Sequence, residues 1–181
     1  MIAKAVELAV GEGLTEQDIY PLTDGALLRS LIRRENPAIE RLIRGVVHRQ
    51  LLKRAYVLSA AEIGRNGRDE LIAKYNRSID ARQQVENEIA EALGVESDQV
   101  ILYCPDISLI KEARVFTLTQ AGVRRLNEPL DSPPFDVKAV EDQYERLWCL
   151  YVFVPESHRD RAGKICESVF GESNAMVDWK S

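Results

Sequence analysis

The sequence of 181 residues is poor in the residue types that build metal centres and disulfide frameworks. Its two histidines, His48 and His158, are each followed by arginine, and neither has a second histidine or a carboxylate at metal-ligand spacing. The three cysteines, Cys104, Cys149 and Cys166, show no CxxC spacing and are expected to be buried thiols in a reducing compartment. We therefore expect neither a metal site nor disulfides in this chain.

Several signatures of catalysis and of membrane insertion are absent as well. No GxSxG, GxxxxGK[ST] or GxGxxG motif occurs, and no apolar run approaches the length of a membrane span. The residues that follow Met1 form an amphipathic pattern rather than a signal peptide. These absences predict a cytoplasmic protein that has no membrane partner and no catalytic site or cofactor of its own.

The sequence is, however, rich enough in apolar residues (45%) to bury a core, and its charge is uneven. The net charge is −5, yet the stretch from Arg29 to Arg54 holds eight lysines and arginines against Glu35 and Glu40. A molecule of this net charge is not expected to bind nucleic acid or membranes generally.

The most informative segment is Ile39–Tyr56, IERLIRGVVHRQLLKRAY. Helical spacing gathers its apolar residues on one stripe, with Arg41, Arg44 and His48 opposite. On that helix Arg49 and Lys53 are four residues apart and lie together at the edge of the stripe. Such a pair can hold a phosphate group, although pairing with Asp or Glu across a helix interface is the commoner role.

The sequence predicts an α+β fold: N-terminal helices, then a ferredoxin-like β-α-β-β-α-β-α unit with a mainly antiparallel four-stranded sheet. Three helices are expected near Ile2–Val10, Thr23–Arg34 and Ile39–Lys53, and the apolar face of the first has no partner upstream in this chain. The later elements are expected at Arg54–Ala60, Asp69–Leu93, Val100–Cys104, Arg114–Leu118, Val137–Leu147, Cys149–Val154 and Ser157–Gly171. Val100–Cys104 is predicted to be a central strand, because its apolar run is unbroken.

Other charged groups have simpler interpretations. The basic face of Arg41, Arg44 and His48 lacks interleaved aromatic residues, so solvation is favoured over nucleic-acid binding. Carboxylates at Glu86, Glu88, Glu91 and Glu96 are predicted to lie on a helix surface.

Four segments together resemble the C-terminal part of HD-domain phosphohydrolases of the deoxynucleoside triphosphate triphosphohydrolase type, the group that includes the enzyme with SAM and HD domains. They are LTDGALLRSL (Leu22–Leu31), ERLIRGVVHRQLLKRAY (Glu40–Tyr56), RVFTLTQAGVRRL (Arg114–Leu126) and YERLWCLYVFV (Tyr144–Val154). The resemblance implies that a divalent metal is bound by a preceding HD core, absent from this sequence, which contains no His-Asp dipeptide. It further implies that Arg49 and Lys53 contact the triphosphate of an activating nucleotide. A third phosphate-contacting lysine of the family falls on Gln120, and this departure puts the complete effector site in doubt.

The resulting prediction is a non-catalytic regulatory and oligomerisation region that associates with an HD catalytic core and forms a homo-oligomer. Residues 1–53 would pack on that core, 54–171 would form the α+β domain, and 172–181 would be a tail with little to hold it. Two alternatives remain: a free-standing ferredoxin-like module that binds a ligand or protein, and a nucleic-acid binder that uses the basic helix. Salt dependence would distinguish the nucleic-acid binder.

Overall fold

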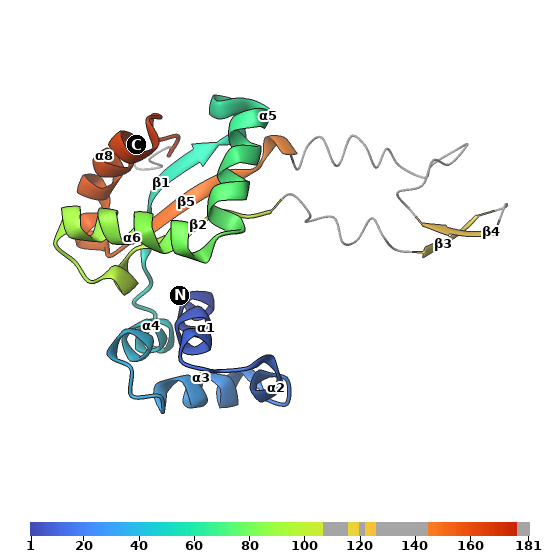
Figure 1. Cartoon of the computed structure of the whole chain (residues 1–181), viewed down its shortest axis with the longest axis vertical. Helices are drawn as coiled ribbons and strands as arrows, with labels where there is room; N and C mark the ends of the chain where they lie inside the picture. The colour runs from blue at the N-terminus through green and yellow to red at the C-terminus, as the bar shows by residue number, and fades with distance from the viewer. Residues whose placement is uncertain (107–115, 120–121, 126–144, 177–181) are drawn as a thin grey trace. The chain divides into compact units, whose positions relative to one another are not determined.

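The computed structural model describes residues 1–106, 116–119, 122–125 and 145–176 (Figure 1). The described residues form helices and short strands, which confirms the predicted α+β class. They fall into two compact units. The first comprises Met1–Val57, Gln83–Tyr103 and Tyr151–Ser181, and the second comprises Leu58–Arg82 and Cys104–Leu150. The division into 1–53, 54–171 and 172–181 remains a prediction.

Three of the four N-terminal helices begin at side chains that satisfy free backbone N–H groups. Thr15 forms a capping box with Asp18, the Thr23 hydroxyl accepts from the N–H of Ala26, and the Asn36 carbonyl accepts from the N–H of Ala38 at 2.8 Å. Pro37 follows Asn36 at the first helical position, where its missing N–H costs nothing. The helices are α1 (Ile2–Gly11), α2 (Glu16–Ile19), α3 (Asp24–Ile32) and α4 (Pro37–Val47).

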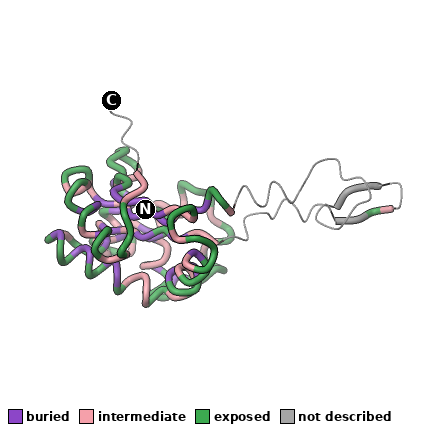
Figure 2. The backbone as a smooth tube through the Cα atoms, turned by 90° about the horizontal axis from the view of Figure 1, so that it is seen from above, coloured by how far each residue is buried: buried purple, intermediate pink, exposed green. Residues whose placement is uncertain are grey.

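These helices share one apolar core, and α1, α3 and α4 lie together in Figure 1. Ala5 and Ala9 of α1 are fully buried beside Ile39 and Ile43 of α4. The apolar face of α1 therefore packs against helices that follow it in the chain. Buried and exposed residues alternate along the helices (Figure 2), as amphipathic helices require.

The main sheet has three strands in the order β1-β5-β2: β1 (Lys53–Ser59), β5 (Cys149–Val154) and β2 (Ile101–Tyr103). β2 pairs antiparallel with β5, with Leu102 opposite Val152. The prediction that Val100–Cys104 is a central strand was wrong, because β2 lies at the edge of this sheet and Tyr103 is 51% exposed. The central position belongs to β5.

A four-stranded ferredoxin-like sheet is not confirmed. β3 (Phe116–Thr119) and β4 (Gly122–Arg125) pair with each other as a separate two-stranded sheet. Most of the helix predicted at Val137–Leu147 lies outside the described residues.

The long helix predicted over Asp69–Leu93 is divided in the structure. It comprises the end of α5 (Ala60–Leu71), a π-helical turn, η1 (Ile72–Asn76), and α6 (Ile79–Leu93). α5 itself contains a kink at Gly64, whose φ of 68° is readily adopted only by glycine.

The remaining helical segments are η2 (Ser97–Gln99), η4 (Glu156–His158) and α8 (Arg159–Phe170). Gly171 ends α8 in the left-handed conformation, as the sequence predicted. The Arg161 guanidinium of α8 donates to the carbonyls of Ala92 and Leu93 at the end of α6. This contact supports the C-terminus of α6, where the last carbonyls lack helical partners.

The segment after α8 is held along β1. The Asn174 amide donates to the carbonyl of Ala55 at 2.8 Å and accepts from the N–H of Val57 at 3.0 Å, and the N–H of Ala175 donates to the carbonyl of Val57. The expectation of a loosely held tail was therefore wrong for this part, while Trp179 lies outside the described residues. Among the described residues, no helix has both the length and the apolar character needed to span a membrane.

Candidate functional site

Arg49 and Lys53 line one pocket in the first unit, although they do not share a helix. The pocket has a volume of about 520 Å³. It is enclosed by the end of α4, the connection to β1, and residues of η2 and η4. The lining residues are Met1, Arg41, Leu42, Arg44, Gly45, Arg49, Gln50, Leu51, Leu52, Lys53, Asp98, Gln99, Pro155 and Glu156.

The predicted continuation of α4 to Lys53 was wrong. α4 ends at Val47, and Lys53 is the first residue of β1. Two apolar residues assigned to the helical stripe are consequently exposed, Val47 by 56% and Leu51 by 50%. The two cations meet at the pocket because the chain turns between them.

Arg49 makes that turn by adopting the left-handed conformation, with φ of 58°. The N–H of Gln50 donates to the carbonyl of Gly45 at 2.7 Å, and the N–H of Arg49 donates to the carbonyl of Val46 at 3.2 Å. This pair of bonds is a Schellman motif, in which the left-handed position is usually glycine. An arginine there costs about 1 to 2 kcal/mol relative to an ordinary backbone conformation.

Close backbone packing supports the turn at Gly45. A methyl group added there would lie 3.0 Å from the carbonyl oxygen of Gln50 and 2.6 Å from the Met1 side chain. Glycine therefore allows the chain after α4 to fold back against the helix. The same backbone forms one wall of the pocket.

The described residues give the pocket a surplus of positive charge, since four of the side chains that line it are cations and two are carboxylates. Arg41 is paired with Asp98 at 2.8 Å, while Lys53 and Glu156 are separated by 3.8 Å. Arg44 pairs with Glu40, on its own helix. For Arg49, which is solvent-exposed, the described part of the chain provides no ion-pair partner within 4.0 Å. Its guanidinium is therefore available to an anion in the pocket.

A family profile described as "HD associated region" matches residues 1–177, nearly the whole chain. The chain belongs to the HD-associated region family. No curated protein and no solved structure matches it. Membership supports association of this HD-associated region with HD-domain proteins.

The described residues of the HD-associated region do not fit the metal centre that the resemblance assigns to an HD core. In the ranges that the structure describes, no group of three or more His, Cys, Asp or Glu side chains could hold a metal ion. The sequence also lacks the His-Asp dipeptide of such a centre. No chemical step is therefore assigned to a metal on this chain.

The third position of the predicted effector site, Gln120, lies outside the described residues. Asp98, Gln99 and Glu156 line the pocket but were not predicted to do so. No local signal reveals them, because they come from segments about 50 and 100 residues away along the chain.

A buried ion pair was also missed. Glu86, predicted to lie on the helix surface, is 1% exposed. Its carboxylate accepts from Lys4 Nζ at 2.5 Å and from the N–H of Leu102 at 2.9 Å. Glu86 therefore gives this backbone N–H, at the edge of the sheet, a hydrogen-bond partner. Burial raises the pKa of Glu86, and Lys4 opposes that shift. A signal existed, because Glu86 has the helical spacing of the buried Ile89, Ala90 and Leu93.

Proposed function

We propose that this HD-associated region is a regulatory, non-catalytic part of a phosphohydrolase that acts on deoxynucleoside triphosphates. In this proposal an HD domain supplies the catalytic metal centre, and the pocket around Arg49 and Lys53 binds the phosphates of a nucleotide effector. The family supports the association with an HD domain. The pocket supports the binding of an anion.

One observation carries the effector site: Arg49 occupies a backbone position that favours glycine. Strained positions of this kind persist where the surrounding structure over-determines them, and they cluster at functional sites. Here the turn directs an arginine to a pocket that Lys53 also lines. Arginine offers a fork of donors that matches phosphate oxygens, and lysine adds a mobile charge.

The size of the pocket fits this role. Small-molecule sites commonly enclose about 300 to 1,000 Å³, and the value here is about 520 Å³. Backbone and apolar groups of Leu42, Leu51 and Pro155 line the pocket beside the cations. A nucleotide would place its phosphates at the cations and its base against the apolar part.

Nucleic-acid binding through α4 receives less support from the contacts. Arg41 is paired with Asp98 and Arg44 with Glu40, so two of the three basic residues on that face are already neutralised. Binding of this kind would also weaken steeply with salt.

Calorimetric titration of the 181-residue chain with deoxynucleoside triphosphates tests the proposal. The double variant Arg49→Ala, Lys53→Ala should weaken binding at this pocket by about 100-fold, since each charged contact contributes about 1.4 kcal/mol or more. The control Arg33→Ala, Lys164→Ala removes the same charge from exposed positions outside the pocket and should leave binding within about twofold. Equal loss in both variants would show that only overall charge matters, and would overturn the pocket assignment.

A further inference from the structure

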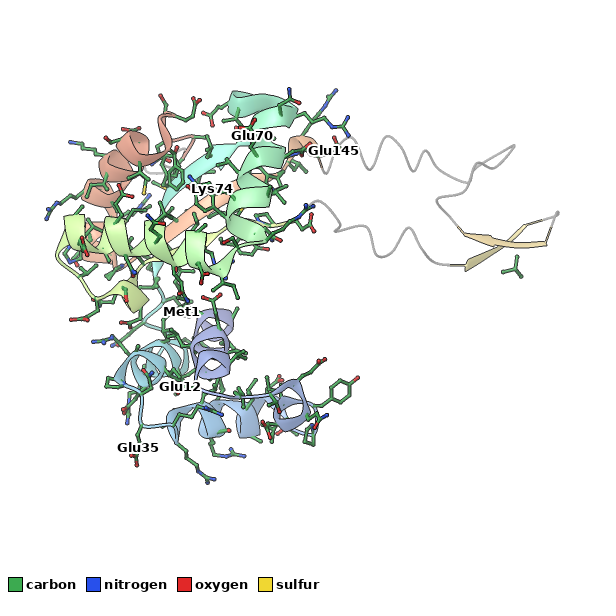
Figure 3. All side chains as sticks on the ribbon, in the orientation of Figure 1. Met1, Glu12, Glu35, Glu70, Lys74 and Glu145 are labelled. Carbon is green, nitrogen blue, oxygen red and sulfur yellow. The ribbon has the colours of Figure 1, made fainter. Side chains whose placement is uncertain are left out.

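A second pocket, of about 370 Å³, lies within the second unit and has no role in the proposed function. It is lined by Ala60, Ala61, Arg65, Arg68, Glu145 and Arg146. Among the described residues, three arginines and one carboxylate line this pocket. The pocket is built by α5 and by the short segment that precedes β5, and Figure 3 shows Glu145 beside α5.

Arg68 is the fixed element of this pocket, because its guanidinium is held in one plane. Its side chain is only 3% exposed. Nε and Nη2 donate to the Asp69 carboxylate at 3.1 and 3.0 Å. Nη1 is then directed to Glu145 Oε2, 3.4 Å away.

Glu145 lies between two arginines without a close bond to either. Its Oε1 is 3.7 Å from Arg65 Nη2, and its Oε2 is 3.4 Å from Arg68 Nη1. Bonds between guanidinium and carboxylate groups are normally about 2.7 to 2.9 Å long. The two arginines therefore hold this carboxylate loosely, and a more highly charged oxyanion would compete with it effectively.

Arg65 and Arg146 provide further positive charges that such an oxyanion would contact. Arg65 is 74% exposed and lies one helical turn before Arg68 on α5, and Arg146 is exposed next to Glu145. Both side chains are long and mobile enough to close on a ligand, whereas Arg68 supplies a preset donor.

We propose that this pocket is a second phosphate-binding site, in which Arg65, Arg68 and Arg146 hold a phosphate group and the Glu145 carboxylate moves aside. The site belongs to the second unit and does not depend on the Arg49 and Lys53 pocket. Its ligand is a phosphate group, either of free polyphosphate or of a nucleotide. The Glu145 carboxylate competes with the phosphate group for the arginines and thereby lowers the affinity of the site for phosphate.

Titration with tripolyphosphate tests the proposal, in the full chain carrying Arg49→Ala and Lys53→Ala so that the first pocket is silent. Arg65→Ala and Arg146→Ala should each weaken binding about tenfold. Glu145→Gln should strengthen it several-fold, because it removes a competing charge while preserving shape. Lys164→Ala, exposed on α8 and outside the pocket, is the charge-matched control and should have little effect.

Weaker binding in Glu145→Gln, or unchanged binding in both arginine variants, would overturn the site. Equal affinities for tripolyphosphate and deoxyadenosine triphosphate would identify free polyphosphate as a sufficient ligand, whereas tighter binding of the nucleotide would identify a nucleotide; both results support a phosphate site. In the complementary variant Arg65→Ala, Arg146→Ala, the first pocket remains intact. Nucleotide binding that persists there reports on the proposed effector site alone, so failures of the two proposals can be told apart.

Discussion

Replacing Arg49 with glycine should separate the structural role of this residue from its role in binding. The left-handed conformation costs an arginine about 1 to 2 kcal/mol, and glycine relieves that cost. Glycine also loses about 0.5 to 1 kcal/mol more conformational entropy on folding. The net expectation is a free energy of unfolding that rises by up to about 1.5 kcal/mol, with a midpoint of about 0.75 kcal/mol. For a chain of this size, the midpoint corresponds to a melting temperature higher by about 1.5 to 3 °C.

Few side-chain contacts are lost in this variant. Arg49 is exposed, and no ion pair within 4.0 Å joins it to the described residues. The Schellman bonds of this turn use backbone groups, which glycine retains. Binding of a deoxynucleoside triphosphate should nevertheless weaken about tenfold, because one charged phosphate contact of about 1.4 kcal/mol disappears.

Glu35 provides the matched control for the backbone effect. It is the other described non-glycine residue with positive φ, at 56°, and it is exposed and absent from the pocket. Its side chain points away from the helices in Figure 3. Glu35→Gly should give a similar rise in melting temperature and leave nucleotide binding unchanged.

Scanning calorimetry measures the melting temperatures of both variants, and isothermal titration measures their affinities for the nucleotide. A lower melting temperature in Arg49→Gly would show that the arginine side chain stabilises the fold. Unchanged nucleotide affinity in that variant would refute the reasoning that strain at this position serves binding.

Four further predictions concern stability and thiol reactivity. Glu86→Ala should lower the free energy of unfolding by about 3 kcal/mol, because it leaves Lys4 buried without its main partner, and Lys4→Met with Glu86→Gln should recover most of the loss in urea titrations. Because the folded-state pKa of Glu86 is raised, its ionisation opposes folding. The free energy of unfolding should therefore increase as pH falls through that pKa, and Glu86→Gln should remove this pH dependence. Burial raises the pKa values of Cys104 and Cys166 to about 12, so a thiol reagent at pH 8 should label them only on unfolding, whereas early labelling of either would contradict their burial. Asn174→Ala should cost about 2 kcal/mol through its two lost bonds to the backbone of β1, measured by the same titration, and a neutral effect would show that the segment after α8 is not held there.

Local signals in the sequence predicted many helix boundaries correctly. Thr23 precedes α3 as its cap, and Gly171 follows α8 in a left-handed conformation. Asn36 also caps a helix, α4, although the sequence predicted that this helix begins at Ile39. Each signal acts within a few residues, which is why it can be recognised without the fold. The end of α4 lacks such a signal, because arginine rather than glycine takes the left-handed position and the apolar pattern continues to Leu51.

Errors of a second kind arose where burial depends on distant segments. The apolar run at Val100–Cys104 predicted a central strand, but Glu86 of α6 covers the edge of β2 by accepting from Leu102. The partner of Glu86, Lys4, is 82 residues away along the chain. The residues of the first pocket illustrate the same limit. Arg49 and Lys53 were predicted together from a continuation of α4 that the structure does not contain, and Asp98 and Glu156 come from distant segments.

The most direct test is an activity assay of a polypeptide that joins this HD-associated region to an HD domain. Hydrolysis of a deoxynucleoside triphosphate would be measured with Mn²⁺ or Mg²⁺ over a range of effector nucleotide concentrations. We expect Arg49→Ala with Lys53→Ala to abolish activation by the effector while leaving the basal rate unchanged, and we expect no hydrolysis by the 181-residue chain alone. Hydrolysis by this chain alone, or full activation of the double variant, would contradict the proposed function.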